Sequence, residues 1–131
     1  MSLEIWIFIA VFVLLDLLFI FLAFRKRKRF SGVEIAEFRS RWQNIRNLKG
    51  KEVILEADNL LHYFLKRKGF TGTMGEMLKR HGAVFSNLND VWYVHKLRNR
   101  IAHEIDVRIS DAEVKKSREI FRRAFGDLGL Q

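Results

Sequence analysis

The sequence predicts an all-α protein, in which a single N-terminal transmembrane helix is followed by a four-helix bundle with a short extra helix. Three observations lead to this prediction. Residues 5–24 are almost continuously apolar, the rest of the chain repeats apolar residues at helical spacing, and proline is absent. Glycines separate the apolar-periodic stretches, as in helices joined by glycine turns. The 131 residues allow one anchor and one compact domain of about 100 residues.

The apolar stretch 5–24 is long enough to cross a membrane. Sixteen of its 20 residues are Ile, Leu, Val or Phe. At about 1.5 Å per residue it spans roughly 30 Å, the thickness of a bilayer's hydrocarbon core. Asp16, near the middle, costs about 2.5–3.5 kcal/mol on insertion scales, whereas the apolar residues contribute roughly 5–10 kcal/mol. Insertion is therefore favoured, and Asp16 is either a polar contact between anchors in an oligomer or a single tolerated carboxyl.

A basic flank follows the apolar stretch directly, formed by Arg25, Lys26, Arg27, Lys28 and Arg29. A cleavable signal peptide is the alternative, but its charges precede a shorter apolar stretch, and no small-residue cleavage site is visible. The positive-inside rule places the flank and everything after residue 30 in the cytoplasm, with the short N-terminus outside. The flank also suits anionic lipid headgroups. We therefore expect a membrane anchor at 1–24, a basic juxtamembrane linker at 25–32 and a helical domain at 33–131.

Apolar residues at 3.6-residue spacing predict four long helices in this domain, at about 33–48, 51–68, 88–104 and 111–125. Thr73 with Glu76, and Ser110 with Glu113, have the spacing of capping boxes. The first box opens a short helix that ends at His81, and the second opens the last long helix. The predicted inward side chains are Ile35, Phe38, Trp42 and Ile45, then Val53, Ile54, Ala57, Leu60, Leu61, Phe64 and Leu65, then Val91, Val94, Leu97, Ile101 and Ala102, and finally Val114, Phe121, Ala124 and Phe125.

Charge and residue types narrow the chemistry of the domain. The net charge is +9, and residues 31–131 hold 19 basic and 13 acidic side chains, a balance that suits phosphate, an anionic lipid surface or simply a soluble domain, so charge alone does not decide between them. The absence of cysteine excludes disulfides, zinc–thiolate sites and thiol nucleophiles. His95 and His103 are eight residues apart on one predicted helix, or about 12 Å, which is too far to share a metal. We expect neither a cofactor nor a metal site.

The segment 95–104 carries the most informative pattern. His95, Asn99 and His103 follow one another at intervals of four residues, so they form one polar stripe on a helix that otherwise faces the core. Arg98, Asn99 and His103 also make up the Arg-x4-His form of the HEPN signature. Further segments share the resemblance, at 53–61, 68–70, 73–78 and 87–92. Over about residues 35–128 the chain resembles small HEPN-like proteins of bacteria, which are often linked to membranes.

The resemblance implies a homodimeric helical bundle in which Arg and His of two protomers meet in a cleft, and a metal-independent endoribonuclease. His103 is then the general base or acid, Arg98 the phosphate clamp and Asn99 an orienting group, with a second His from the partner chain. Imidazole can exchange a proton with a ribose 2′-hydroxyl or a leaving oxygen, and guanidinium can hold a phosphate by two hydrogen bonds. RNA or a nucleotide is the implied ligand, and an antitoxin-like protein is a further implied partner. Three more residues are expected to support the site: His95, Glu56 and Asp58.

Two other interpretations of the domain stay open. The three motif side chains can instead form a buried polar network that fixes helix packing, with Glu56 or Asp58 as counter-groups. The domain is then a non-catalytic binding and dimerisation module that holds a nucleotide, RNA or protein partner at the membrane. In the third interpretation the domain is a plain scaffold, and function resides in Asp16 and the anchor.

Overall fold

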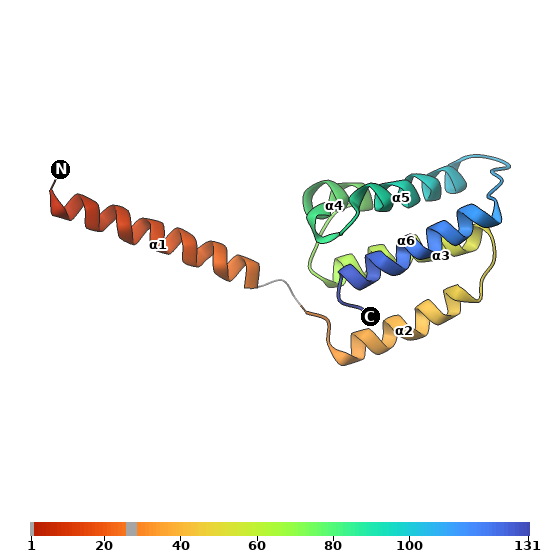
Figure 1. Cartoon of the computed structure of the whole chain (residues 1–131), viewed down its shortest axis with the longest axis horizontal. Coiled ribbons are helices and arrows are strands. Elements are labelled where there is room, and N and C mark those ends of the chain that lie inside the picture. The colour runs from red at the N-terminus through yellow and green to blue at the C-terminus, as the bar shows by residue number, and fades with distance from the viewer. Residues whose placement is uncertain (1, 26–28) are drawn as a thin grey trace.

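In a computed structural model of the chain, the described residues 2–25 and 29–131 form an all-helical structure (Figure 1). The elements in order are α1 (Leu3–Arg25), α2 (Gly32–Arg46), α3 (Lys51–Arg67), α4 (Met74–His81), the 3-10 helix η1 (Gly82–Val84), α5 (Leu88–His103) and α6 (Asp111–Asp127). The predicted all-α class is confirmed. Of the predicted basic flank, Lys26, Arg27 and Lys28 lie outside the described residues, and so does the side chain of Arg25.

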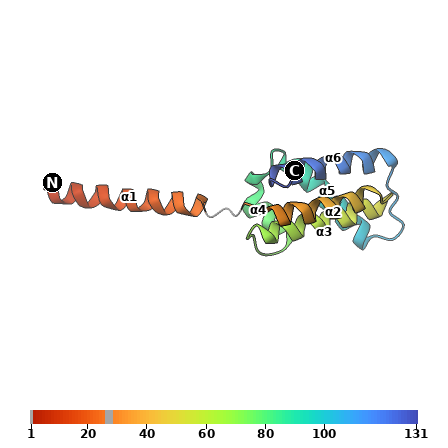
Figure 2. The same cartoon turned by 90° about the horizontal axis from the view of Figure 1, so that it is seen from below.

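Helix α1 is long and apolar enough to cross a membrane over Leu3–Ala23. Every described side chain from residue 2 to residue 23 is exposed, and Figures 1 and 2 show the helix standing apart from the other five. A helix that is apolar all round normally lies in a protein core or in a bilayer. Since this chain does not bury it, its apolar surface requires cover from lipid or from another chain.

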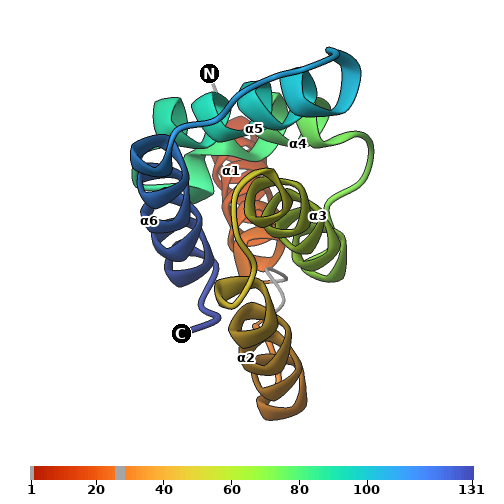
Figure 3. The same ribbon diagram turned by 90° about the vertical axis from the view of Figure 1, so that its right-hand side faces the viewer.

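Helix α3 is the central helix of the bundle. The end-on view in Figure 3 shows α2 and α5 on opposite sides of α3, with α6 alongside, and α3 packs against all three. The short helix α4 packs on α5. The apolar residues predicted to face inward on α3 are all buried, which confirms the periodicity: Val53, Ile54, Ala57, Leu60, Leu61, Phe64 and Leu65.

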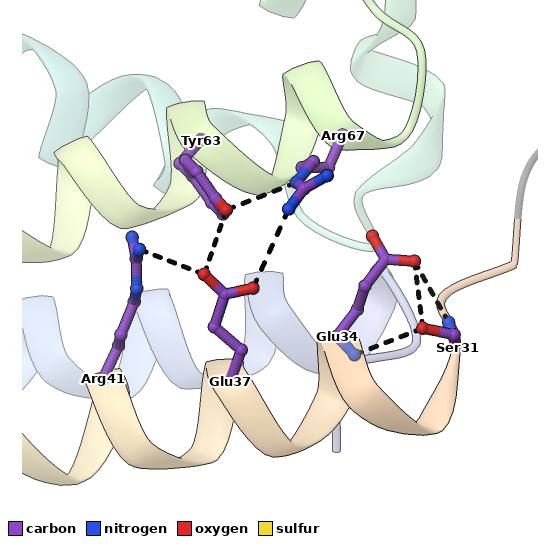
Figure 4. A network of polar contacts seen from close by, with 6 residues as sticks. All are labelled: Ser31, Glu34, Glu37, Arg41, Tyr63 and Arg67. Carbon is purple, nitrogen blue, oxygen red and sulfur yellow. Dashed lines mark hydrogen bonds and ion pairs between the residues drawn. The ribbon is translucent and has the colours of Figure 1, made fainter.

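A polar cluster on the outer side of the bundle joins α2 to α3 (Figure 4). The Tyr63 hydroxyl donates to Glu37 Oε1 at 2.9 Å, and Arg41 Nη2 lies 3.0 Å from the same oxygen. Arg67 Nε donates to the Tyr63 oxygen at 3.3 Å, and this hydrogen bond raises the pKa of the Arg67 guanidinium. Partly exposed polar contacts of this kind contribute little to stability, so they orient α2 while the apolar core holds it.

The starts of the helices follow the predicted caps. The Ser110 hydroxyl accepts the Glu113 backbone N–H at 3.1 Å, and the Glu113 carboxylate accepts the Ser110 backbone N–H at 2.9 Å. At the start of α4 only half of the predicted box is formed, with the Thr73 hydroxyl accepting the Glu76 N–H at 3.2 Å. Ser31, which was not among the predicted caps, begins α2 with a capping box that is visible in Figure 4. Each cap satisfies backbone donors that a helix leaves unpaired at its N-terminus.

The end of α6 differs from the prediction. The helix was expected to stop before Gly126, but it continues to Asp127. The chain turns at Gly129, which adopts a φ of +83° that favours glycine. The next residue, Leu130, is fully buried, and its N–H donates to Phe125 O at 3.1 Å. The burial of Leu130 therefore determines where the chain turns. Gly126, the first glycine that could have ended the helix, does not.

Two smaller predictions were also wrong. The first bundle helix was expected at 33–48, but α2 ends at Arg46, because the Asn47 N–H bonds to Asn44 O in a tighter final turn. Ala102 was expected to face inward, but it is exposed, and Ile101 is only half-buried. The last turn of α5 therefore lies beyond the buried core.

Candidate functional site

A closed polar network joins α3 to α5. His95 Nδ1 lies 3.3 Å from Asp58 Oδ1, and Asn99 Nδ2 lies 3.4 Å from His95 Nε2. Arg98 Nη1 donates to Asn99 Oδ1 at 3.2 Å. Arg98 Nε closes the ring as an ion-pair contact, 3.7 Å from Asp58 Oδ2. Each of the four side chains thus contacts two others, and Asp58 is the member that comes from α3.

The network is buried at its inner end. Asp58 lies one helical turn after Ile54 and shares its inward face, so its exposed fraction is only 4%. His95, next to Val94 on α5, is 9% exposed. Buried polar groups are tolerated when they are hydrogen-bonded, because an unpaired one costs its full desolvation energy. Each of these two side chains is the partner that makes burial of the other acceptable.

The directions of the hydrogen bonds assign the roles of the His95 ring nitrogens. The Asn99 oxygen accepts from Arg98, so the amide NH₂ group faces His95 Nε2, which must accept. Nδ1 then carries the ring proton and donates to Asp58. The chain of donors therefore runs from Arg98 through Asn99 and His95 to the Asp58 carboxylate.

Arg98 and His103, the two ends of the motif, lie on different parts of α5. The Arg98 side chain is 31% exposed, with its guanidinium against Asp58. His103 is the last residue of α5 and is exposed to solvent. Helical geometry separates the two residues by about 7.5 Å along the axis and by about 140° around it. A single α5 therefore does not direct both side chains at one phosphate.

Four of the six predicted site residues lie together in the network, and two lie outside it. His103 is outside because it extends from the end of α5. Glu56 is exposed and lines a groove between α2 and α3. Two residues along a helix turn a side chain by about 200°, so Glu56 faces away when Asp58 faces inward. Asp58, and not Glu56, is the counter-group of the network.

Sequence reasoning missed the aromatic and basic side chains beside this network. Trp92 is half-buried, and its ring lies edge-on to His95 with the ring centroids 6.1 Å apart. It lines a surface groove of about 570 Å³ together with Lys79, Asn89, Tyr93 and Lys96. His95 lies three residues after Trp92 on the same helix, and Lys96 lies four residues after it. This spacing is the signal that could have revealed the groove.

No protein-family model, curated protein or solved structure matches this chain. The class of protein is defined by the fold and the site. It is an all-helical domain with a buried Asp–His pair behind a partly exposed Arg–Asn pair, preceded by a helix able to cross a membrane.

Proposed function

We propose that the protein is a membrane-tethered, HEPN-like endoribonuclease that cleaves RNA without a metal ion and acts as a homodimer. The observation that carries this proposal is the arrangement on α5. The helix exposes the His103 imidazole at its end, and one turn earlier it holds a partly exposed Arg98–Asn99 pair against buried groups. A proton-exchanging group and a phosphate-binding group are thus both within reach of solvent.

These side chains suit the two tasks of RNA transesterification. His103 takes the proton from a ribose 2′-hydroxyl, whose oxygen attacks the adjacent phosphorus. The bond to the 5′-oxygen breaks, and that oxygen receives the proton that the His103 imidazolium returns through a water molecule. The products are a 2′,3′-cyclic phosphate and a 5′-hydroxyl. The partner's Arg98 binds the non-bridging phosphate oxygens and stabilises their growing negative charge.

The divergence of Arg98 and His103 on one helix supports the dimer. Because the two side chains point about 140° apart, a phosphate bound by one chain's guanidinium is better approached by an imidazole from a second chain. Anchoring by α1 supports the same arrangement. Confinement to a membrane raises the effective concentration of one protomer around another, so a modest interface suffices for pairing.

Asp58 and His95 are positioning residues in this proposal. Asp58 lies 3.7 Å from Arg98 Nε, and the His95–Asn99 contact orients the amide that accepts from Arg98 Nη1. A guanidinium held in place before RNA arrives loses less side-chain entropy when it binds phosphate. The network therefore supports both the packing of α3 on α5 and the geometry of the site.

The proposed topology places α1 across the bilayer, the N-terminus outside and the bundle in the cytoplasm. The predominantly apolar surface of α1, exposed at every described side chain from residue 2 to residue 23, supports the span. The basic run 25–29 supports the orientation through the positive-inside rule.

RNA cleavage in EDTA by the full-length chain in nanodiscs tests the proposal. His103→Ala and Arg98→Ala are each expected to slow cleavage by at least about 100-fold, the lower limit both for loss of acid–base catalysis and for loss of a group that stabilises charge in the transition state. His62→Ala and Arg39→Ala are the matched controls, since they remove the same groups from α3 and α2 and should leave the rate within about twofold. Equal cleavage by all four variants would rule out the assignment of the site.

The alternative function is a non-catalytic binding and dimerisation module. One observation favours it: within the part of the chain that the structure describes, the side-chain polar contacts of Asn99 and Arg98 all lie in the network. Such an arrangement can serve packing alone. A folded dimer that binds RNA or a nucleotide but cleaves none of a varied set of RNAs would establish this alternative.

A further inference from the structure

The surface groove beside the network combines aromatic and basic side chains. It lies along α4 and α5, and we call it the aromatic–basic groove; its lining residues are Lys79, Asn89, Trp92, Tyr93 and Lys96. Its volume of about 570 Å³ lies within the range of roughly 300–1,000 Å³ for ligand pockets. Lys116 extends to it from α6, with Nζ 4.3 Å from the centre of the Tyr93 ring.

The charge of the groove is positive. Lys79, Lys96 and Lys116 are exposed, and among the described residues none of them has an ion-pair contact with a carboxylate. The nearby acid Asp90 is already engaged, because its Oδ2 lies 3.6 Å from Arg123 Nη1. The three ammonium groups are therefore available to phosphate.

The aromatic rings supply a second kind of contact. Trp92 and Tyr93 are half-buried, so each is fixed by the core on one side and reaches the surface on the other. Lys96 Nζ lies 5.9 Å from the centre of the Trp92 ring. An exposed lysine leaves such a ring readily, because the cation–π attraction in water is weak. Rings for bases, next to ammonium groups for phosphates, are the features that bind single-stranded nucleic acid.

We propose that the aromatic–basic groove binds single-stranded RNA and leads it to the site on α5. Bases stack on the two rings, and the lysines hold the phosphates. The groove lies on the same side of α5 as His103, because the 11 residues from Trp92 to His103 rise about 16 Å with a net turn of only about 20°, whereas Arg98 faces about 120° away from Trp92. The inference rests on the proposed function and adds how the substrate is held.

Binding of a labelled oligouridine of about 12 nucleotides tests the inference, with a length chosen from the usual site sizes of single-strand binders. The protein is the full-length chain carrying His103→Ala, which prevents cleavage, in nanodiscs of neutral lipid. The double variant Lys79→Gln, Lys96→Gln is expected to bind roughly 10- to 30-fold more weakly at about 0.1 M salt. Its plot of log affinity against log salt should be less steep by about 1.4, or 0.7 for each lost phosphate contact. The control pair Lys51→Gln, Lys115→Gln removes the same charge elsewhere and should change neither quantity by a comparable amount.

Tyr93→Leu separates stacking from charge, since it keeps an apolar side chain in the same place. Loss of one stacked base is expected to weaken binding about 5- to 20-fold while the salt slope stays unchanged. Duplex RNA of equal length should bind more weakly than the single strand, because its bases are already stacked. Equal effects of the two lysine pairs, or equal affinity for duplex and single strand, would overturn the inference.

The outcomes distinguish this inference from the proposed function. If the protein without the His103→Ala change cleaves RNA and the groove variants bind like the control pair, the groove assignment fails and the nuclease stands. If that protein binds single strands through the groove but cleaves none, the nuclease fails and the groove stands.

Discussion

Removal of the Asp58 carboxylate is the most informative single change to the bundle. Asp58 is 4% exposed and contacts His95 at 3.3 Å and Arg98 at 3.7 Å. In Asp58→Ala, His95 Nδ1 loses its acceptor and the Arg98 guanidinium loses its counter-charge. The cavity left by the carboxylate adds to the loss, since Asp58 is buried and α3 packs against α5.

The magnitude follows from the burial of each contact. A hydrogen bond to a charged group is worth about 1.5–3 kcal/mol, and the buried His95 contact belongs to this kind. An exposed ion pair is worth about 0.2–1 kcal/mol, and the long contact to the partly exposed Arg98 lies near this value. Asp58→Ala should therefore lower the free energy of unfolding by about 2–4 kcal/mol, below the usual 3–5 kcal/mol for breaking a fully buried pair. Asp58→Asn keeps an acceptor for His95 and should cost about half as much.

Urea unfolding of the full-length chain in a mild detergent measures this loss. Trp42 and Trp92 pack against the core and report unfolding by fluorescence, while Trp6 in α1 adds a constant background. Glu56→Ala is the matched control, because it removes an exposed carboxylate from the same helix and should change stability by less than about 0.5 kcal/mol. An Asp58→Ala protein as stable as the Glu56→Ala protein would refute the role of the network in packing.

Three further predictions concern the anchor and the caps. The chain should stay in the membrane fraction on alkaline carbonate extraction, and its release by carbonate would contradict the span. Changing residues 25–29 to glutamine should give a mixture of the two orientations in the membrane, which protease access to the bundle measures. Asp16→Leu should leave self-association in detergent unchanged if α5 pairs the protomers, whereas loss of the dimer in sedimentation would assign the contact to the anchors. Ser110→Ala should cost about 1 kcal/mol in urea unfolding because it removes the acceptor for the Glu113 N–H. The control Ser40→Ala lies mid-helix and exposed, so an equal cost for both would refute the capping argument.

The positions of the helices could be predicted from the sequence, because a helix that packs on a core repeats its apolar residues at a regular local spacing. The inward face of α3 was correct at every apolar position, and the Thr73 and Ser110 caps begin the predicted helices. The end of α6 was missed because a glycine permits a turn but does not require one. Whether the chain turns at Gly126 or Gly129 depends on where Leu130 packs, which is a tertiary property.

The candidate site could be predicted only in part. The spacing from Ile54 to Asp58 already favours burial of Asp58 over Glu56, but its pairing with His95 spans 37 residues and depends on how α3 crosses α5. The aromatic–basic groove was missed for the same reason, since Lys79 comes to Trp92 only through the packing of α4 on α5. Periodicity identified the faces of the helices, and packing decided which polar residues meet.

The chemistry of the cleaved ends tests the central claim most directly. RNA is incubated in EDTA with the full-length chain in nanodiscs, and the termini of the fragments are identified by mass spectrometry. Attack by the ribose 2′-oxygen, with His103 exchanging the protons, predicts fragments that end in a 2′,3′-cyclic phosphate and begin with a 5′-hydroxyl. Fragments with 3′-hydroxyl and 5′-phosphate ends, or RNA that stays intact, would contradict the account.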